Sequence, residues 1–298
     1  MFSQFFGNYL LKRRLINPEQ LREVLALQDA VRVKIGILAI DAGYMNAAQV
    51  EEVHHLQTSL DKRFGEIAID KGYLDEDQLN DVLGQQNKRH LLVSQALIDK
   101  EIMTFEQVET ALIEYKKESG LSEVEFEALK NNDLDTVSKA LVKLPDLGDP
   151  TVYTEYFSLF IRNLIRFIDN GIAIEPAEKI AEQELECLIH QELVGRFRIF
   201  TGLAGPEEGM AEFARRFAKM EVNGMDEVGR DALGEFMNVH NGLFLSKLSN
   251  DWVELELYPA EYKQGGSIKA VGVVYAIPFS LPFGSFTFYL GLGSPVIR

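Results

Sequence analysis

The sequence predicts a multi-domain protein, in which an all-α helical repeat region is followed by an α+β domain with an antiparallel sheet and long helices. Three observations predict this class. A chain of 298 residues with 46% hydrophobic residues is long enough for two ordinary cores. The first third repeats one pattern every 29 residues. The second half reads as a helix, a strand, two helices and then several strands, an order typical of an α+β domain.

The composition restricts the partners and the compartment. A formal net charge of −16 disfavours nucleic acid and anionic membranes as partners and favours basic ones. The single cysteine, Cys187, excludes an intrachain disulfide and fits a reducing compartment. The segment Phe2–Leu11 does not read as a signal peptide, because it is short and its basic neighbours follow it. No run approaches the ~20 apolar residues of a membrane helix. We therefore expect a cytoplasmic protein that binds no nucleic acid and does not insert into membranes.

Residues 1–117 read as four copies of one helical unit. Glycines and glutamines recur at the 29-residue interval, in the sets Gly7, Gly36, Gly65 and Gln20, Gln49, Gln78, Gln107 and Gln28, Gln57, Gln86. Each copy predicts a short apolar helix, a tight turn and a second helix. The second helix begins at an N-cap residue that is followed three positions later by glutamine, the spacing of a capping box; these N-cap residues are Asn17, Asn46, Asp75 and Thr104. The recurring glutamines thus have a structural explanation that needs no ligand.

Residues 118–150 read as a helical linker, and 151–298 as the second domain. The linker ends in Leu144–Pro150, whose prolines, glycine and aspartates are typical of a turn. A strongly apolar helix is predicted over Val152–Asp169, while Ala173–Cys187 stays unassigned. The remaining predicted elements are a strand over Glu192–Phe200, a helix that starts at Gly205, a helix from Gly229 to about Leu248, and strands over Asp251–Tyr258, Ile268–Ile277 and Ser285–Leu290.

The helix from Gly229 carries the candidate site. At about 100° per residue it places one polar stripe on one face, formed by Asp231, Glu235, Asn238 and Gly242. The opposite, apolar face holds Leu233, Phe236, His240, Leu243 and Phe244. Periodicity alone predicts only a solvated face. The pair of Glu235 and Asn238 adds chemistry, because an acid can hold a cation and an amide can orient a water molecule.

The repeats resemble the MshEN module found at the front of type II secretion and pilus ATPases. The matching positions in the third copy are Arg63, Gly65, Ile69, Gly72, Leu74, Leu79, Leu83 and Gln86. The second copy departs from the pattern, since Lys34 replaces the arginine, although Gly36 fits. The resemblance implies cyclic di-GMP binding at Lys34, Gly36, Arg63, Gly65, Gly72 and Gln86. The alternative is that glycines and aliphatic pairs at these spacings are packing features.

The second domain resembles the CheC, CheX and FliY chemotaxis phosphatases. The series Asp231, Glu235, Asn238 and Pro259 follows the family's pattern, and the order of elements around it agrees, which predicts an α+β CheX-like domain. The first helix lacks the second acid–amide pair of CheC-like members, which favours the CheX type. The resemblance implies a phosphatase that acts on the aspartyl phosphate of a CheY-like response regulator.

The same resemblance implies the roles of the residues. Glu235 would hold the regulator's lysine, Asn238 would orient the attacking water, and Asp231 and Gly242 would contact the partner. The Mg²⁺ belongs to the partner regulator, so the chain needs no metal or cofactor of its own. Pairing of CheX-type domains through their sheets implies a homodimer. The alternative function is a non-catalytic signalling adaptor, or a cyclic di-GMP receptor that binds a response regulator or a secretion or pilus component.

Overall fold

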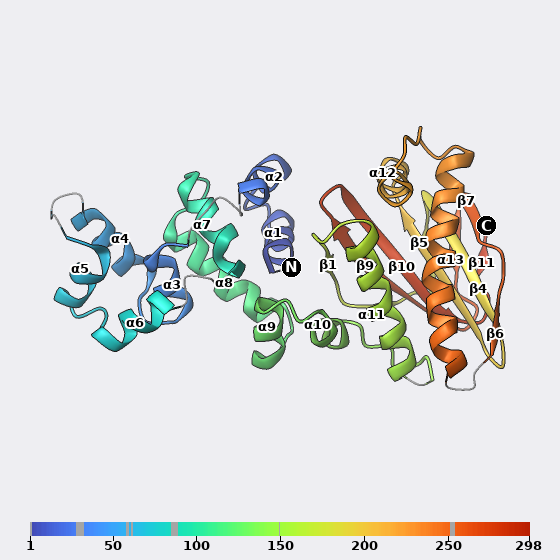
Figure 1. The fold of residues 1–298 in the computed structure, drawn as a ribbon, viewed down its shortest axis with the longest axis horizontal. Coiled ribbons are helices and arrows are strands. Elements are labelled where there is room, and N and C mark those ends of the chain that lie inside the picture. Colours follow the sequence, from blue (N-terminus) through green and yellow to red (C-terminus); the bar gives the residue numbers. More distant parts are fainter. Residues whose placement is uncertain are drawn as a thin grey trace. The chain divides into compact units, whose positions relative to one another are not determined.

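The computed structural model describes residues 2–27, 33–57, 60, 62–84, 89–148, 150–250 and 254–298. The chain divides into two compact units, Met1–Asn132 and Asp133–Arg298 (Figure 1). The division falls inside the predicted linker 118–150. Helix α9 (Glu123–Lys130) therefore belongs to the first unit and helix α10 (Leu134–Leu141) to the second.

The described part of the first unit is entirely helical. Four helix pairs follow one another, and α9 and the short 3-10 helix η1 (Arg89–Leu91) complete the unit. The pairs are α1 (Phe2–Lys12) with α2 (Pro18–Leu27), α3 (Ile35–Asp41) with α4 (Ala47–Gln57), α5 (Phe64–Asp70) with α6 (Glu76–Gly84), and α7 (Leu92–Asp99) with α8 (Phe105–Glu118).

The first helix of each pair ends in the same turn. In the third pair, the backbone N–H of Tyr73 donates to the oxygen of Ala68 and that of Gly72 to Ile69, both at 2.9 Å, which is the Schellman arrangement. This turn needs one residue with positive φ. The residues that supply it are Arg14 (56°), Gly43 (71°), Gly72 (70°) and Glu101 (56°). The chain therefore makes this turn even in the two pairs that lack the glycine.

The second helix of each pair starts with the predicted capping box. Asn46 Oδ1 accepts from the backbone N–H of Gln49, and Gln49 Oε1 accepts from that of Asn46, both at 2.9 Å. The same reciprocal bonds join the other predicted pairs, Asn17 with Gln20, Asp75 with Gln78, and Thr104 with Gln107. The predicted capping boxes are confirmed at all four positions.

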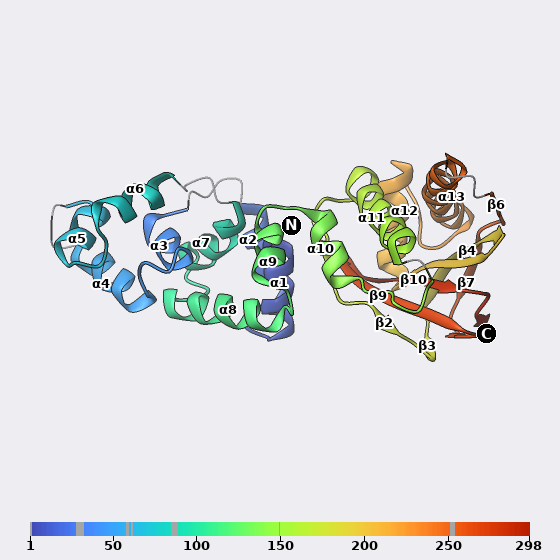
Figure 2. The same cartoon turned by 90° about the horizontal axis from the view of Figure 1, so that it is seen from below.

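The second unit places long helices on one face of an antiparallel sheet (Figure 2). The helices are α11 (Pro150–Phe167), α12 (Glu207–Ala218) and α13 (Glu227–Asn250). In the described residues the main sheet has eight strands, in the order β1-β9-β10-β5-β4-β6, with β2 paired to β9 and β7 paired to β4. These strands are β1 (Ala173–Ile174), β2 (Glu178–Lys179), β4 (Cys187–Gly195), β5 (Arg198–Gly205), β6 (Leu255–Leu257), β7 (Glu261–Gln264), β9 (Val273–Leu281) and β10 (Gly284–Leu292).

The two faces of this sheet bury different groups. The helix-covered face has an aromatic core in which Phe160 stacks on Phe288 at 4.0 Å and meets Phe236 edge-on at 6.0 Å. A second core lies on side chains of the opposite parity, among them Phe200 of β5, and includes Ile268 of β8. Strand β8 (Ser267–Lys269) belongs to a small sheet with β3 (Glu182–Glu184) and β11 (Val296–Ile297).

Several predicted elements need correction. The predicted strand Glu192–Phe200 is wrong, because it spans the end of β4, a tight turn and the start of β5; the turn is closed by the Gly195 N–H donating to Phe197 O at 3.1 Å. The predicted strand Ile268–Ile277 is two strands, β8 and β9, in different sheets. Of the predicted strand Asp251–Tyr258, residues 251–253 lie outside the described residues, and only Leu255–Leu257 form a strand, β6.

Candidate active site

Helix α13 presents the predicted polar stripe. Asp231, Glu235 and Asn238 are exposed, while Gly242 is half-buried. The rotation of the helix is set by Phe236, which is fully buried and meets the ring of Phe213 edge-on at 4.9 Å. The predicted buried face is confirmed by a set of buried side chains, Leu233, Phe236, His240 and Phe244. Leu243 is the exception: it is 43% exposed, because it lies at the edge of the apolar stripe.

Glu235 and Asn238 are neighbours in space. The amide nitrogen Nδ2 of Asn238 lies 3.3 Å from Glu235 Oε2, and the amide oxygen Oδ1 accepts a hydrogen bond from Gln191 Nε2 at 2.7 Å. The exposed carboxylate of Glu235 thus lies beside the amide of Asn238, and a hydrogen bond from Gln191 holds that amide in place. The acid can take a cation and the amide can contact a polar group of a partner.

The loop after β6 forms the opposite wall of the site. Pro259 and Ala260 line an open depression of about 390 Å³ together with residues of α13, namely Arg230, Asp231, Gly234, Glu235 and Asn238. The structure therefore brings Asp231, Glu235, Asn238 and Pro259 to one place, as the sequence pattern predicts. Gly242, one turn further along α13, does not line this depression.

Arg230 is a cation that sequence reasoning missed. Its guanidinium lies 4.9 Å from the centre of the Tyr262 ring, and its Nε donates to the backbone oxygen of Met225 at 2.8 Å. It gives one wall of an otherwise acidic depression a positive charge. Its position next to Asp231 in the sequence was a signal, but only the path of β7 shows that Tyr262 lies beneath it.

The buried groups near the site are not reactive. Cys187 is fully buried and accepts a hydrogen bond from Tyr262 Oη at 3.1 Å, and burial raises the pKa of its thiol. Burial also lowers the pKa of His240 to about 3, so its ring is neutral near pH 7. These two residues therefore offer neither a thiolate nucleophile nor a base that titrates near neutrality.

Comparisons with solved structures give chemotaxis proteins. CheX from Vibrio vulnificus matches with a TM-score of 0.43 and 15% identity, over 48% of this chain and 99% of that chain. CheX from Desulfovibrio desulfuricans matches with a TM-score of 0.42 and 16% identity, over 48% and 99%. The CheX–CheY–BeF3–Mg complex from Borrelia burgdorferi matches with a TM-score of 0.39 and 14% identity, over 48% and 98%. No protein-family model and no curated protein matches the sequence.

No group of three or more His, Cys, Asp or Glu side chains is arranged to hold a metal ion in the part of the chain that the structure describes. Among the helices of that part, none combines the length and apolar character needed to cross a membrane.

The ligand residues predicted in the first unit have structural roles. A Cβ added at Gly36 would lie 2.6 Å from Val50 Cγ1, and one at Gly65 would lie 2.7 Å from Leu79 Cδ2. These glycines let the two helices of a pair pack closely, whereas Gly72 supplies the positive φ of the turn. The nucleotide prediction at these positions stays a prediction.

The remaining predicted ligand residues lie at helix starts or outside the described residues. Lys34 Nζ forms an ion pair with Asp99 Oδ1 at 2.6 Å. The backbone N–H of Arg63 donates to Glu66 Oε2 at 2.8 Å, at the start of α5. Gln86 lies outside the described residues.

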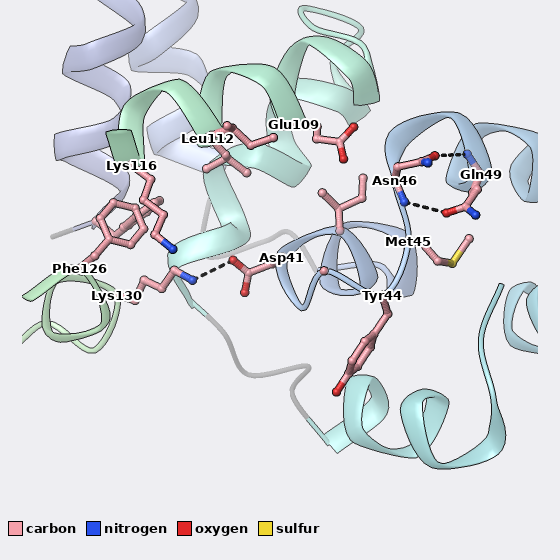
Figure 3. Close-up of a pocket in the computed structure, with 14 residues that line it drawn as sticks. Asp41, Tyr44, Met45, Asn46, Gln49, Glu109, Leu112, Lys116, Phe126 and Lys130 are labelled. Atoms are coloured by element: carbon pink, nitrogen blue, oxygen red, sulfur yellow. Dashed lines mark hydrogen bonds and ion pairs between the residues drawn. The ribbon is translucent and has the colours of Figure 1, made fainter. Parts of the chain in front are cut away.

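The first unit has a pocket that is lined by none of the predicted ligand residues (Figure 3). It has a volume of about 480 Å³, between the α3–α4 turn and helices α8 and α9. Its charged side chains pair within the protein: Lys130 Nζ lies 3.0 Å from Asp41 Oδ1, and Glu109 Oε2 accepts from the backbone N–H of Ala47 at 3.0 Å. The pairing stabilises the junction of these helices.

Proposed function

We propose that this chain hydrolyses the aspartyl phosphate of a CheY-like response regulator, with Glu235 and Asn238 as its two catalytic side chains. The observation that carries the proposal is their geometry. Both lie on the exposed face of α13 and line the same depression as Pro259. Asn238 Nδ2 lies 3.3 Å from Glu235 Oε2, and a hydrogen bond from Gln191 holds the Asn238 amide. These are the positions at which the sequence matches the chemotaxis phosphatase pattern.

The reaction needs little from this chain. Water attacks the phosphorus atom, the bond between phosphorus and the aspartyl oxygen breaks, and aspartate and inorganic phosphate are released. The regulator supplies the Mg²⁺ and the lysine that neutralise charge on the phosphoryl group. Glu235 holds that lysine by charge, and Asn238 hydrogen-bonds the water in line for attack, so catalysis consists of positioning.

The rest of the stripe fits a partner surface. Asp231 precedes Glu235 by one turn and adds a second negative charge. Gly242 follows Asn238 by one turn, and a Cβ placed there would meet no atom within 4 Å. The absence of a side chain at Gly242 is therefore not required by packing. It lets the backbone of the partner approach α13.

The test is the decay of a phosphorylated regulator from the same organism. Wild-type chain should accelerate the decay, and Asn238→Ala should lose about 100-fold or more of that acceleration, as expected for removal of a positioned hydrogen-bonding group. Binding of the regulator should stay close to wild type, because an exposed amide contributes little to affinity. Equal decay with wild-type chain, variant and no added protein would favour the signalling adaptor instead.

For the first unit we propose a sensory or partner-binding role, with cyclic di-GMP as the predicted ligand. Calorimetric titration of the full chain with cyclic di-GMP should give saturable heat, because a guanidinium pairs with phosphate or stacks on guanine. Arg63→Ala should remove that heat, and the matched control Arg22→Ala, outside the predicted ligand set, should keep it. Flat calorimetry with wild type at high ligand concentration would exclude this ligand.

A further inference from the structure

We infer that Gln191 is a positioning residue that decides which end of the Asn238 amide faces the partner. Gln191 is held by a hydrogen bond to the backbone carbonyl of Tyr258. The residue after Tyr258 is Pro259, which favours an extended conformation at Tyr258. The inference rests on the proposed function of Asn238. It assigns the NH₂ group, rather than the carbonyl oxygen, as the end of the amide that Asn238 turns toward the phosphoryl site.

The side-chain amide of Gln191 is held in one orientation by its hydrogen-bond partners. This side chain is 1% exposed, and its Nε2 donates to the backbone oxygen of Tyr258 at 2.8 Å. A backbone carbonyl can only accept hydrogen bonds, so the nitrogen end of the amide must face Tyr258. The oxygen end then faces Asn241, whose Nδ2 donates to Gln191 Oε1 at 2.8 Å.

The orientation of Gln191 fixes that of the Asn238 amide. Gln191 Nε2 also donates to Asn238 Oδ1 at 2.7 Å, which uses its second hydrogen. If the Asn238 amide were turned over, two NH₂ groups would face each other and the bond would be lost. Asn238 therefore keeps its oxygen inward and its Nδ2 outward, 3.3 Å from Glu235 Oε2.

Further hydrogen bonds of Asn241 and Thr201 close the network behind Gln191. Asn241 Nδ2 donates also to Thr201 Oγ1 at 3.3 Å, and Thr201 Oγ1 donates to the backbone oxygen of Gln191 at 3.2 Å. The hydroxyl of Tyr156 donates to Asn241 Oδ1. Since these amide and hydroxyl groups all have partners of the correct kind, the network holds one arrangement.

Pro259 acquires a role from the same network. A residue before proline is restricted to extended conformations, which fixes the direction of the Tyr258 carbonyl. The backbone N–H of Tyr258 donates to the oxygen of Glu192 at 2.9 Å, so the segment is held at both ends. Pro259 thus acts on Asn238 through Tyr258 and Gln191.

The kinetic test uses Gln191→Met, which keeps the length of the side chain but removes its donors. The rate of dephosphorylation at a saturating concentration of the chain should fall about 10-fold to 100-fold, because the amide of Asn238 is no longer held in place. The concentration of the chain at half-saturation should not change.

Two further variants separate positioning from stability. Val274→Ala removes buried apolar groups from the core on the other face of the sheet and should lower thermal stability while the rate stays at the wild-type value. Pro259→Ala should release the Tyr258 anchor and cost several-fold in rate without opening the core. Wild-type rates in both Gln191→Met and Pro259→Ala would overturn the inference.

A second measurement does not depend on activity. The side-chain amide of Asn238 should give NMR signals displaced from solvent-exposed values in wild type, and these should move to exposed values in Gln191→Met but not in Val274→Ala. Unchanged signals in Gln191→Met would overturn the positioning role even if the phosphatase is active. Displaced signals in a protein that dephosphorylates no regulator would leave the positioning intact and remove the proposed function.

Discussion

At the residue scale, the site separates chemistry from support. Glu235 and Asn238 are exposed, where the proposed function places the partner, whereas Gln191 and Asn241 are buried and hold the amide in place. A buried polar group is costly unless it is fully hydrogen-bonded. The network under Asn238 satisfies that condition and so adds rigidity where the proposed reaction needs position.

His240 gives a prediction about pH. Its folded-state pKa of about 3 lies below the ordinary histidine value, because burial disfavours the charged ring. The unfolded chain therefore binds the extra proton first, and the stability that the neutral ring contributes is lost as the pH falls from ~6.5 toward 3. The slope approaches about 1.4 kcal/mol per pH unit.

The measurement is amide hydrogen exchange in β5, which reports on the second unit. Wild type should lose protection steadily between about pH 6 and pH 4.5. His240→Leu should lose less over the same interval, whatever its stability near pH 7, since it has no ring to protonate. Parallel slopes for both proteins would contradict the assignment.

The recognisable part of the site is the part that is periodic. Glu235 and Asn238 could be predicted because one helix carries both, three positions apart. Gln191 could not, because the strand was predicted to begin at Glu192. With β4 starting at Cys187, Gln191 falls on the buried side of the alternation between Ile189 and Leu193, and a glutamine there is a signal of a buried network.

At the element scale, the first unit uses glycine in two ways. Gly36 lies where two helices of a pair approach each other, and Gly72 lies in an open turn with φ 70°. A sequence reading cannot separate the two uses, because both recur every 29 residues. The structure distinguishes them, because a Cβ added at Gly36 would lie 2.6 Å from Val50 Cγ1, whereas one added at Gly72 would meet no atom within 4 Å.

These two uses predict different rescue behaviour. Gly72→Ala should cost about 1 kcal/mol of unfolding free energy, from the positive φ alone. Gly36→Ala should cost ~1–3 kcal/mol, because the new methyl meets Val50. Adding Val50→Ala should recover part of the loss in Gly36→Ala and none in Gly72→Ala.

The measurement is denaturant unfolding followed by the helical circular dichroism signal. Gly84→Ala is a matched control, since a Cβ there meets no atom within 4 Å and no positive φ is required. Equal rescue of both glycine variants by Val50→Ala would contradict the separation of roles.

In the second unit, long elements could be predicted from the sequence better than short ones. The long helices α11, α12 and α13 and strand β10 carry clear periodicity. The short strands β1, β2 and β3 do not, because two or three residues are too few for an alternation to be read. The apolar run over Ile268–Ile277 concealed the turn at Gly272, whose φ of 95° separates β8 from β9.

At the scale of the whole molecule, the negative charge suits the proposed function, in which the metal and the lysine belong to the partner. Under that proposal, a formal net charge of −16 would attract a basic patch around the regulator's lysine and speed encounter at low ionic strength. The homodimer expected from the resemblance stays a prediction, which light scattering of the purified chain would measure. The sensory or partner-binding role proposed for the helical unit would act through a separate surface of the chain.

The most direct measurement of the central claim is the decay of a phosphorylated CheY-like regulator at saturating concentrations of this chain. Wild type is predicted to shorten the lifetime of the aspartyl phosphate. Asn238→Ala is predicted to bind the phosphorylated regulator equally well and to leave its lifetime close to that of the regulator alone. An unchanged lifetime with wild type, or a variant as fast as wild type, would contradict the assignment of Asn238 as a catalytic residue.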